Sequence, residues 1–169
     1  MLSEKMEKAL NEQINAEFES AYLYLSMATW FEEQNLDGMA NWMMIQFREE
    51  ETHALKIYDY VNERGGRVLL KPIKGPKTEW DSILQVFEET LEHERLVSSL
   101  INNLVNIAVE EKDHATNSML QWFVDEQVEE EASADKIVNQ LKLIGDNPQG
   151  IFMLDREMSQ RNFVDETAG

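Results

Sequence analysis

Glu50 and His53 stand three residues apart in a segment of strongly helical pattern, and both side chains are of types that bind metal ions. Residues separated by three positions lie on the same face of an α-helix, so this carboxylate and this imidazole can reach one ion together. A further acid, Glu17, lies 33 residues before Glu50. A single Glu-x-x-His pair says little by itself, so its meaning depends on the other acids of the chain.

The same spacing recurs in the second half of the sequence. Glu94 lies 33 residues before Gln127, which belongs to an acidic cluster at residues 126–130. A shift of 77 residues therefore maps Glu17 onto Glu94 and Glu50 onto Gln127. Two helical hairpins that carry acids at matching depth on both arms are the layout of a metal site inside a four-helix bundle.

These acids interrupt apolar stripes, whereas solvated charges belong on the opposite helix face. Glu17, for example, follows Ile14 by three residues and precedes Ala21 by four. The same pattern surrounds three further acids, Glu50, Glu94 and Glu130. An ionised carboxylate in a core is costly unless it is paired or bound to a metal, so four at one depth predict a pair of divalent cations. The alternative is that the acids lie at the stripe edges and reach solvent.

The donor types indicate which metal the site would take. Oxygen donors predominate, one imidazole accompanies them, and the chain has no cysteine. Such a set suits iron or manganese, and zinc can also occupy it. Glu50 is the candidate bridge between two ions. Tyr24, two turns after Glu17, is expected just outside the ligands, although a core tyrosine with a satisfied hydroxyl would show the same spacing.

Composition limits the functions that the chain can have. The 169 residues are 43% hydrophobic and are expected to form one domain, residues 1–169. The absence of cysteine excludes disulfides and thiolate chemistry and fits a cytoplasmic location. The formal charge of −18 disfavours nucleic acid and anionic membranes as partners, and it would attract cations. Neither a secretory signal nor a membrane-spanning run is expected.

Hydrophobic periodicity predicts an all-α protein with helices at about residues 3–33, 38–64, 79–112, 114–144 and 148–161. The expected N-caps of the first four are Ser3, Asp37, Thr78 and Asp113. Residues 67–78 contain two prolines and a glycine and could extend about 40 Å, enough to cross the whole bundle. We therefore expect a long crossover that makes the second and third helices parallel.

Two residues near these acids are assigned to other environments. His93 adjoins Glu94 but points about 100° away around the helix, so it is expected at the surface. Trp122, five residues before Gln127, is expected in the core or in the wall of the site.

Taken together, these motifs resemble those of the prokaryotic non-haem ferritins, and the resemblance extends over essentially the whole chain. It implies a ferritin-like four-helix bundle with a short fifth helix. It also implies that Glu17, Glu50 and His53 hold one ferroxidase iron. The second iron would be held by Glu50, Glu94 and Glu130, with Gln127 nearby as a hydrogen-bonding partner or weak ligand.

The resemblance assigns roles to further residues. Glu49, Glu126 and Glu129, joined by Glu130, match a third iron site on the cavity side. Tyr24 would tune the site or donate an electron to it. No haem is expected, because Thr52 stands where bacterioferritins have a methionine ligand.

The function expected from this resemblance is iron storage and detoxification. The chain would act as a ferroxidase, oxidising Fe²⁺ with dioxygen or peroxide and storing Fe³⁺ as an oxyhydroxide mineral in a homo-oligomeric shell of twenty-four subunits. The main alternative is a rubrerythrin-like di-iron peroxidase without storage. A purely structural acidic assembly is a further alternative.

Overall fold

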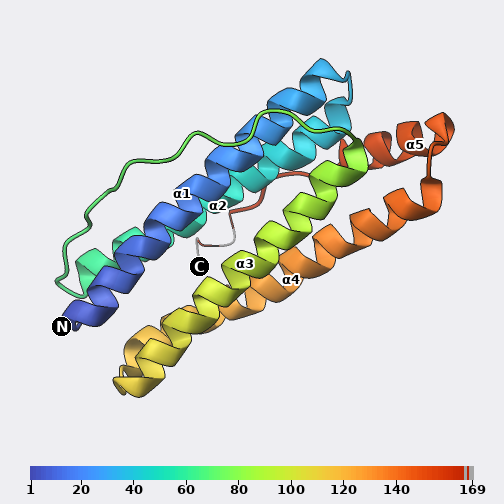
Figure 1. Cartoon of the computed structure of the whole chain (residues 1–169). Coiled ribbons are helices and arrows are strands. Elements are labelled where there is room, and N and C mark those ends of the chain that lie inside the picture. The colour runs from blue at the N-terminus through green and yellow to red at the C-terminus, as the bar shows by residue number, and fades with distance from the viewer. Residues whose placement is uncertain (166, 168–169) are drawn as a thin grey trace.

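The computed structural model describes residues 1–165 and 167, and all regular structure within them is helical. The five helices are α1 (Glu4–Glu33), α2 (Asp37–Glu63), α3 (Ile83–Glu110), α4 (His114–Ile144) and α5 (Pro148–Met158). Figure 1 shows two long hairpins, α1 with α2 and α3 with α4, lying side by side, and α5 turning back from the end of α4. None of these helices is long and apolar enough to span a membrane.

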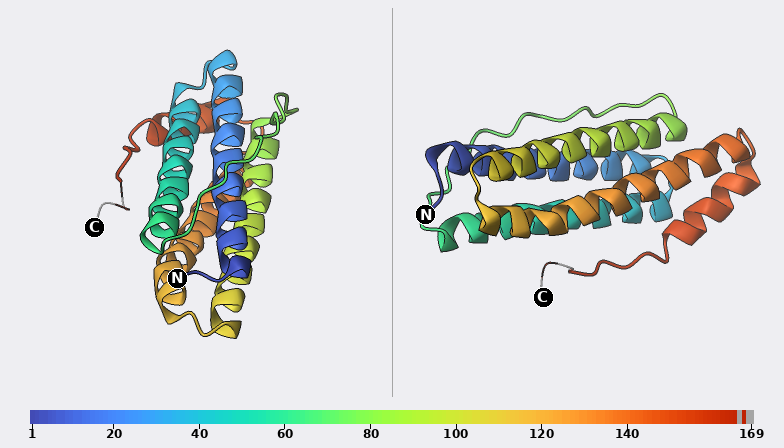
Figure 2. Two further views of the ribbon diagram at one scale, coloured as in Figure 1. Left: turned by 90° about the vertical axis from the view of Figure 1, so that its left-hand side faces the viewer. Right: turned by 90° about the horizontal axis from the view of Figure 1, so that it is seen from below.

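The crossover between α2 and α3 runs the length of the bundle, as the sequence predicted. In Figures 1 and 2 it follows the outside of α1, so that α2 and α3 run in the same direction. Asn11 fixes its first part, because its Nδ2 donates to the Arg67 carbonyl at 3.0 Å and its Oδ1 accepts from the Leu69 amide at 2.6 Å. Ser26 fixes its last part by donating to the Lys77 carbonyl at 2.7 Å. Side chains of α1 therefore hold a segment that has no regular structure of its own.

Several predicted helix ends are confirmed. The Ser3 hydroxyl accepts from the Met6 amide, and the Asp113 carboxylate accepts from the Thr116 amide at 3.1 Å. Gly145 follows α4 with a φ of 57°, a conformation that glycine adopts without strain. These signals were readable because each cap lies within four residues of the groups that it bonds.

The predicted start of the third helix was wrong. The N-cap is Ser82, whose hydroxyl accepts from the Gln85 amide at 3.1 Å, and not Thr78. Trp80 explains the shift, because its indole is buried and donates to Glu89 at 2.8 Å. This tertiary contact holds the residues before Ser82 outside the helix.

Two other ends differ from the prediction because tertiary contacts replace local caps. Asp37 is the first residue of α2 and not its N-cap, since the Met39 amide donates to Asp155 of α5 at 2.9 Å. The fifth helix ends at Met158, three residues before the predicted end. Asn41 of α2 donates to the carbonyls of Met158 and Arg161, so α2 holds the segment that follows α5.

The core consists of two apolar clusters with a polar layer between them. One cluster includes Tyr24, Phe31 and Phe87, and the other includes Ile14 and Phe123. The layer between them contains buried acids, glutamines and a histidine from all four long helices: Gln13, Glu17, Gln46, Glu50, His53, Glu94, Gln127 and Glu130. Hydrophobic packing above and below therefore holds a layer that is itself polar.

The contact between α5 and the start of α2 gives a first prediction. A β-carbon at the buried Gly38 would collide with the backbone carbonyl of Asp155. We expect Gly38→Ala to displace α5 and to lower the free energy of unfolding by about 1–3 kcal/mol, the usual range for overpacking. Thermal and denaturant unfolding would measure this, with Gly75→Ala as the control because a β-carbon there meets no atom within 4 Å. Equal stabilities of the two variants would contradict this packing.

Candidate metal centre

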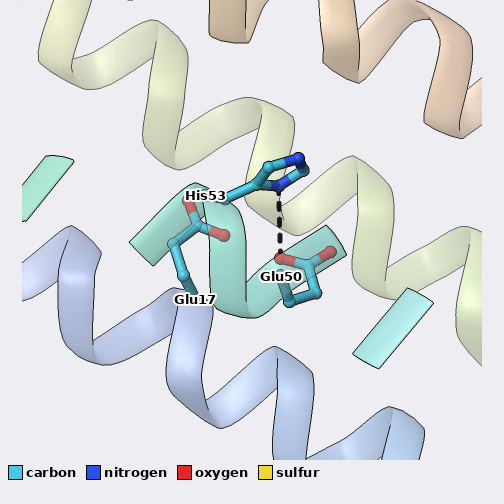
Figure 3. Close-up of side chains that lie close together, drawn as sticks. All are labelled: Glu17, Glu50 and His53. Atoms are coloured by element: carbon cyan, nitrogen blue, oxygen red, sulfur yellow. Dashed lines mark ion pairs between the residues drawn. The ribbon is translucent and has the colours of Figure 1, made fainter. Parts of the chain in front are cut away.

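Glu17 of α1 and Glu50 and His53 of α2 converge in the polar layer. One possible ligand atom from each lies within 4.8 Å of the others, and the three residues are only 1–3% exposed. Figure 3 shows the two carboxylates and the imidazole directed toward a common point between the helices. The Nδ1 atom of His53 lies 3.6 Å from Oε2 of Glu50. Two carboxylates and an imidazole in this arrangement could bind one divalent cation.

Three carboxylate oxygens in this group have no hydrogen-bond partner. They are Oε2 of Glu17 and both side-chain oxygens of Glu50, and no other buried side-chain nitrogen or oxygen in the described residues lacks one. A buried acceptor without a donor loses its hydration and gains nothing in return. Protons or a metal ion would supply what these oxygens lack.

Burial changes the protonation of all four acids and of the histidine. It raises the pKa of Glu17 and, together with repulsion from the other acids, raises that of Glu50 well above its usual value. Burial also raises the pKa of Glu94 to about 7 and that of Glu130 to about 8. Burial lowers the pKa of His53 to about 4, so its imidazole is neutral at pH 7 and can act as a ligand.

Glu94 of α3 lies across the layer and is held by two donors. The Tyr24 hydroxyl donates to Oε1 of Glu94, and the Gln127 amide donates to Oε2 at 3.1 Å. Tyr24 is therefore a buried tyrosine with a satisfied hydroxyl whose partner is one of the predicted ligands. Gln127 presents its amide nitrogen to Glu94, which is the geometry of a hydrogen-bonding partner.

Glu130 of α4 completes the layer. Its Oε2 accepts from Nε2 of Gln46 at 2.8 Å. Its charge, like that of Glu94, adds to the repulsion at Glu50. The structure thus brings acids from all four long helices around Glu50, as the spacing predicted, while their role as iron ligands stays a prediction.

The residues of the predicted third site are less closely gathered. Glu49 is partly buried and pairs with Arg161 at 2.7 Å. Glu126 is partly buried and Glu129 is exposed, on the same helix as Glu130. In the described part of the chain, the ligand atoms of Glu49, Glu126 and Glu129 do not form a group as tight as the first one.

The side chains that hold the acids in place were not predicted from the sequence. Gln13 donates to Oε1 of Glu17 at 2.7 Å, and Gln46 donates to Glu130. Gln13 lies one helical turn before Glu17, and Gln46 lies one turn before Glu50, so the two glutamines are also 33 residues apart. That repetition was a readable signal, whereas nothing local indicated Arg161.

His93, which was expected at the surface, is instead partly buried. Its Nε2 lies 2.8 Å from the Ser20 hydroxyl, and its ring meets the ring of Tyr24 edge-on at 5.9 Å. Burial lowers the pKa of His93 to about 4. A side chain turned 100° from Glu94 points at α1 and is only partly exposed, because α1 and α3 pack together. On the other side of the layer, Trp122 packs edge-on against His53 at 5.4 Å and forms part of the wall.

Comparisons with known proteins agree with this architecture. The ferritin-like domain family matches residues 7–144. A bacterial non-heme ferritin of Bacteroides fragilis is 48% identical over 161 residues, covering 95% of this chain and all of its own. The corresponding protein of Staphylococcus epidermidis is 42% identical over 166 residues, covering 98% of this chain and all of its own.

A solved structure agrees closely as well. An open pore ferritin from the hyperthermophilic archaeon Archaeoglobus fulgidus superposes with a TM-score of 0.95 and 54% sequence identity. The match covers 96% of this chain and all of that chain.

The raised pKa values give a second prediction. A carboxyl group whose pKa is higher in the folded chain than in the unfolded chain binds more protons when folded, so stability falls as pH rises between the two values. For Glu130 that interval runs from about 4.5 to about 8. We therefore expect the melting temperature of the metal-free protein to fall from pH 5 to pH 8.5, and to fall less in Glu130→Gln.

Calorimetry in the presence of a chelator would measure this difference. Glu129→Gln removes one charge from the exposed side of the same helix and is the matched control. If Glu130→Gln and Glu129→Gln had the same pH dependence, Glu130 would not be a buried, protonated acid in the metal-free protein.

Proposed function

The chain belongs to the ferritin family, whose members store iron, and from this premise we propose that it is a ferroxidase that fills its own store. Fe²⁺ would be oxidised at the buried layer of acids, and the Fe³⁺ product would be kept as an oxyhydroxide mineral inside a multimeric shell. The observation that carries the proposal is the set of three carboxylate oxygens without partners beside a neutral imidazole. A protein that used this layer only for packing would gain stability by replacing such acids with apolar residues.

We assign the ligands by their position in the layer. Glu17, Glu50 and His53 would hold one Fe²⁺, since their ligand atoms lie within 4.8 Å of one another. Glu50, Glu94 and Glu130 would hold the second, with Glu50 as the bridge. Supporting this role for Glu50, both of its oxygens lack other partners.

The charges balance in this assignment. Four ionised carboxylates carry four negative charges, and two Fe²⁺ ions carry four positive charges. Because the pKa of Glu94 and that of Glu130 are raised to about 7 and about 8, binding near neutral pH would displace protons from them. Oxidation of both ions then adds two positive charges that the layer does not balance, which favours hydrolysis and release of the product.

Two Fe²⁺ ions give one electron each, which together reduce dioxygen to peroxide or peroxide to water. The hydroxyl of Tyr24 donates to Glu94, so this side chain is placed to tune the second iron or to supply a further electron. Gln127 donates to the other oxygen of Glu94 and is assigned a hydrogen-bonding role.

The product would leave the layer through the acids beside it. Glu49 is the neighbour of Glu50 along α2, and Glu126 and Glu129 flank Gln127 and Glu130 along α4. We propose that these three acids, together with Glu130, take up a third iron on its way to the mineral.

Assembly into a shell of twenty-four subunits is part of the proposal. Large apolar side chains are exposed near the end of α4 and on α5: Leu143, Phe152 and Met153 are 89%, 61% and 71% exposed. An isolated soluble chain rarely exposes such groups together, so contact with other subunits is the simplest account of them.

The first test of this function is the variant Glu50→Ala. It removes the bridge and two of the three oxygens without partners, so rapid oxidation of Fe²⁺ should fall to the rate seen in buffer alone. Stopped-flow absorbance would measure it, with sedimentation to show that the assembly is intact. Glu19→Ala, an exposed acid on α1, is the control and should oxidise iron like the unmodified protein. Unchanged oxidation in Glu50→Ala would refute the assignment.

A second test separates storage from simple turnover. Iron added in steps under air should oxidise rapidly up to about two Fe²⁺ per subunit and then more slowly, with soluble mineral inside a large particle. Saturation at about two irons in a small oligomer, with rapid turnover of peroxide and no mineral, would indicate the rubrerythrin-like peroxidase instead.

A further inference from the structure

Arg161 lies beyond the end of α5, yet its guanidinium reaches the edge of the candidate metal centre. Its Nη1 donates to Oε1 of Gln46 at 2.5 Å, and its Nη2 donates to Oε2 of Glu49 at 2.7 Å. The guanidinium also lies over the Trp42 ring, 4.9 Å from its centroid. Arg161 therefore contacts Gln46, which donates to the predicted ligand Glu130, and also Glu49, a residue of the predicted third site.

The backbone around Arg161 is fixed, so this contact is part of the fold. Asn41 donates to the Arg161 carbonyl at 3.1 Å and to the Met158 carbonyl at 3.3 Å. Asp155 accepts from the Met39 amide, two residues earlier on α2. Figure 2 shows the chain running back along the bundle after α5. The segment that carries Arg161 is thus held on α2 by several hydrogen bonds.

Arg161 determines which way the buried amide of Gln46 points. A guanidinium can only donate hydrogen bonds, so Gln46 must turn its oxygen toward Arg161. Its amide nitrogen then faces Glu130 and donates to Oε2 at 2.8 Å. Gln46 is 0% exposed, so water cannot take the place of either partner.

Arg161 also balances the charge of Glu49. The two side chains are 27% and 17% exposed, so solvent screens the pair only in part. Glu49 adjoins Glu50 in the chain and belongs to the proposed third site. A metal ion that uses Glu49 must therefore compete with a cation that is already bound to it.

We propose that Arg161 is a positioning residue that orients Glu130 through Gln46 and, by pairing with Glu49, weakens the binding of a metal ion at Glu49. This inference rests on the proposed ferroxidase function. It predicts two effects of opposite sign when Arg161 is changed. Metal binding at the Glu130 side of the pair weakens, and metal binding at Glu49 strengthens.

The test uses the assembled, metal-free protein and Zn²⁺ alone, with calorimetry as the readout, so that no oxidation is involved. In Arg161→Gln we expect the second Zn²⁺ of the pair to bind 10-fold to 100-fold more weakly, the usual effect of removing a group that orients a ligand. A further Zn²⁺ should bind about tenfold more tightly than in the unmodified protein, because its carboxylate has lost a charged partner. Adding Glu49→Gln should abolish that gain.

Three other variants separate the two effects. Gln46→Leu should weaken the second Zn²⁺ without strengthening the further one, since Arg161 still pairs with Glu49. Arg161→Lys keeps a charge beside Glu49 but loses the planar fork, so it should show the same pattern. Arg156→Gln removes an α5 guanidinium that lies over the Phe152 ring and should leave Zn²⁺ binding unchanged.

The outcomes distinguish this inference from the proposed function. If the unmodified protein and Glu50→Ala bind Zn²⁺ alike, the paired site itself is wrong. The other outcome is that the unmodified protein binds two Zn²⁺ ions tightly and that Arg161→Gln binds these two ions and the further Zn²⁺ with unchanged affinities. In that case only the role of Arg161 is refuted. Sedimentation and circular dichroism would establish that each variant is folded and assembled. If Arg161→Gln does not fold or assemble, Arg161→Lys provides the test.

Discussion

Four carboxyl groups in one layer of an apolar core are the constraint on which the rest of this structure depends. In the described residues no lysine or arginine bonds to any of the four. The donors that hold three of them, Glu17, Glu94 and Glu130, are neutral: a phenol and three amides. A cationic side chain would occupy the space and the charge that a metal ion needs. Neutral donors instead orient the oxygens and add no positive charge to the layer. The layer is consequently unfavourable in itself, and the apolar clusters on either side of it must hold the helices together.

Much of this arrangement could be predicted from periodicity. A helix repeats about every 3.6 residues, so the face that Glu17 shares with Ile14 is fixed once the segment is known to be helical. The spacing of 33 residues then sets the depth, because the hairpin turns are short and leave little freedom in register. The long crossover followed from its prolines and its length. These inferences held because each depends on groups close together in the sequence or on the length of one segment.

The parts that could not be predicted depend on contacts between distant elements. Thr78 and Ser82 are both acceptable N-caps, and the burial of Trp80 beside Trp30 of α1 decides between them. Gln46 lies one turn before Glu50, but its hydrogen bond goes to a different helix. Arg161 follows a short helix whose direction no local pattern gives. The acids could be found because helical geometry places them, whereas the residues that support them require the packing of several helices to be known.

The positions of these supporting contacts explain how α2 and α4 are joined. At one end Arg64, the C-cap of α2, pairs with Asp113, the N-cap of α4, at 3.2 Å. At the other end α5 continues from α4, turns back onto α2, and places Arg161 against Gln46 (Figure 1). Between these ends lie like-charged carboxyl groups, which repel when they are ionised. A pair of divalent cations would turn this repulsion into attraction, so metal binding would add to the contacts that Gln46 and His53 of α2 already make with α4 across the layer. The closed ends fix the separation of the acids in the metal-free chain, and at the proposed site this separation would favour the ions that fit it.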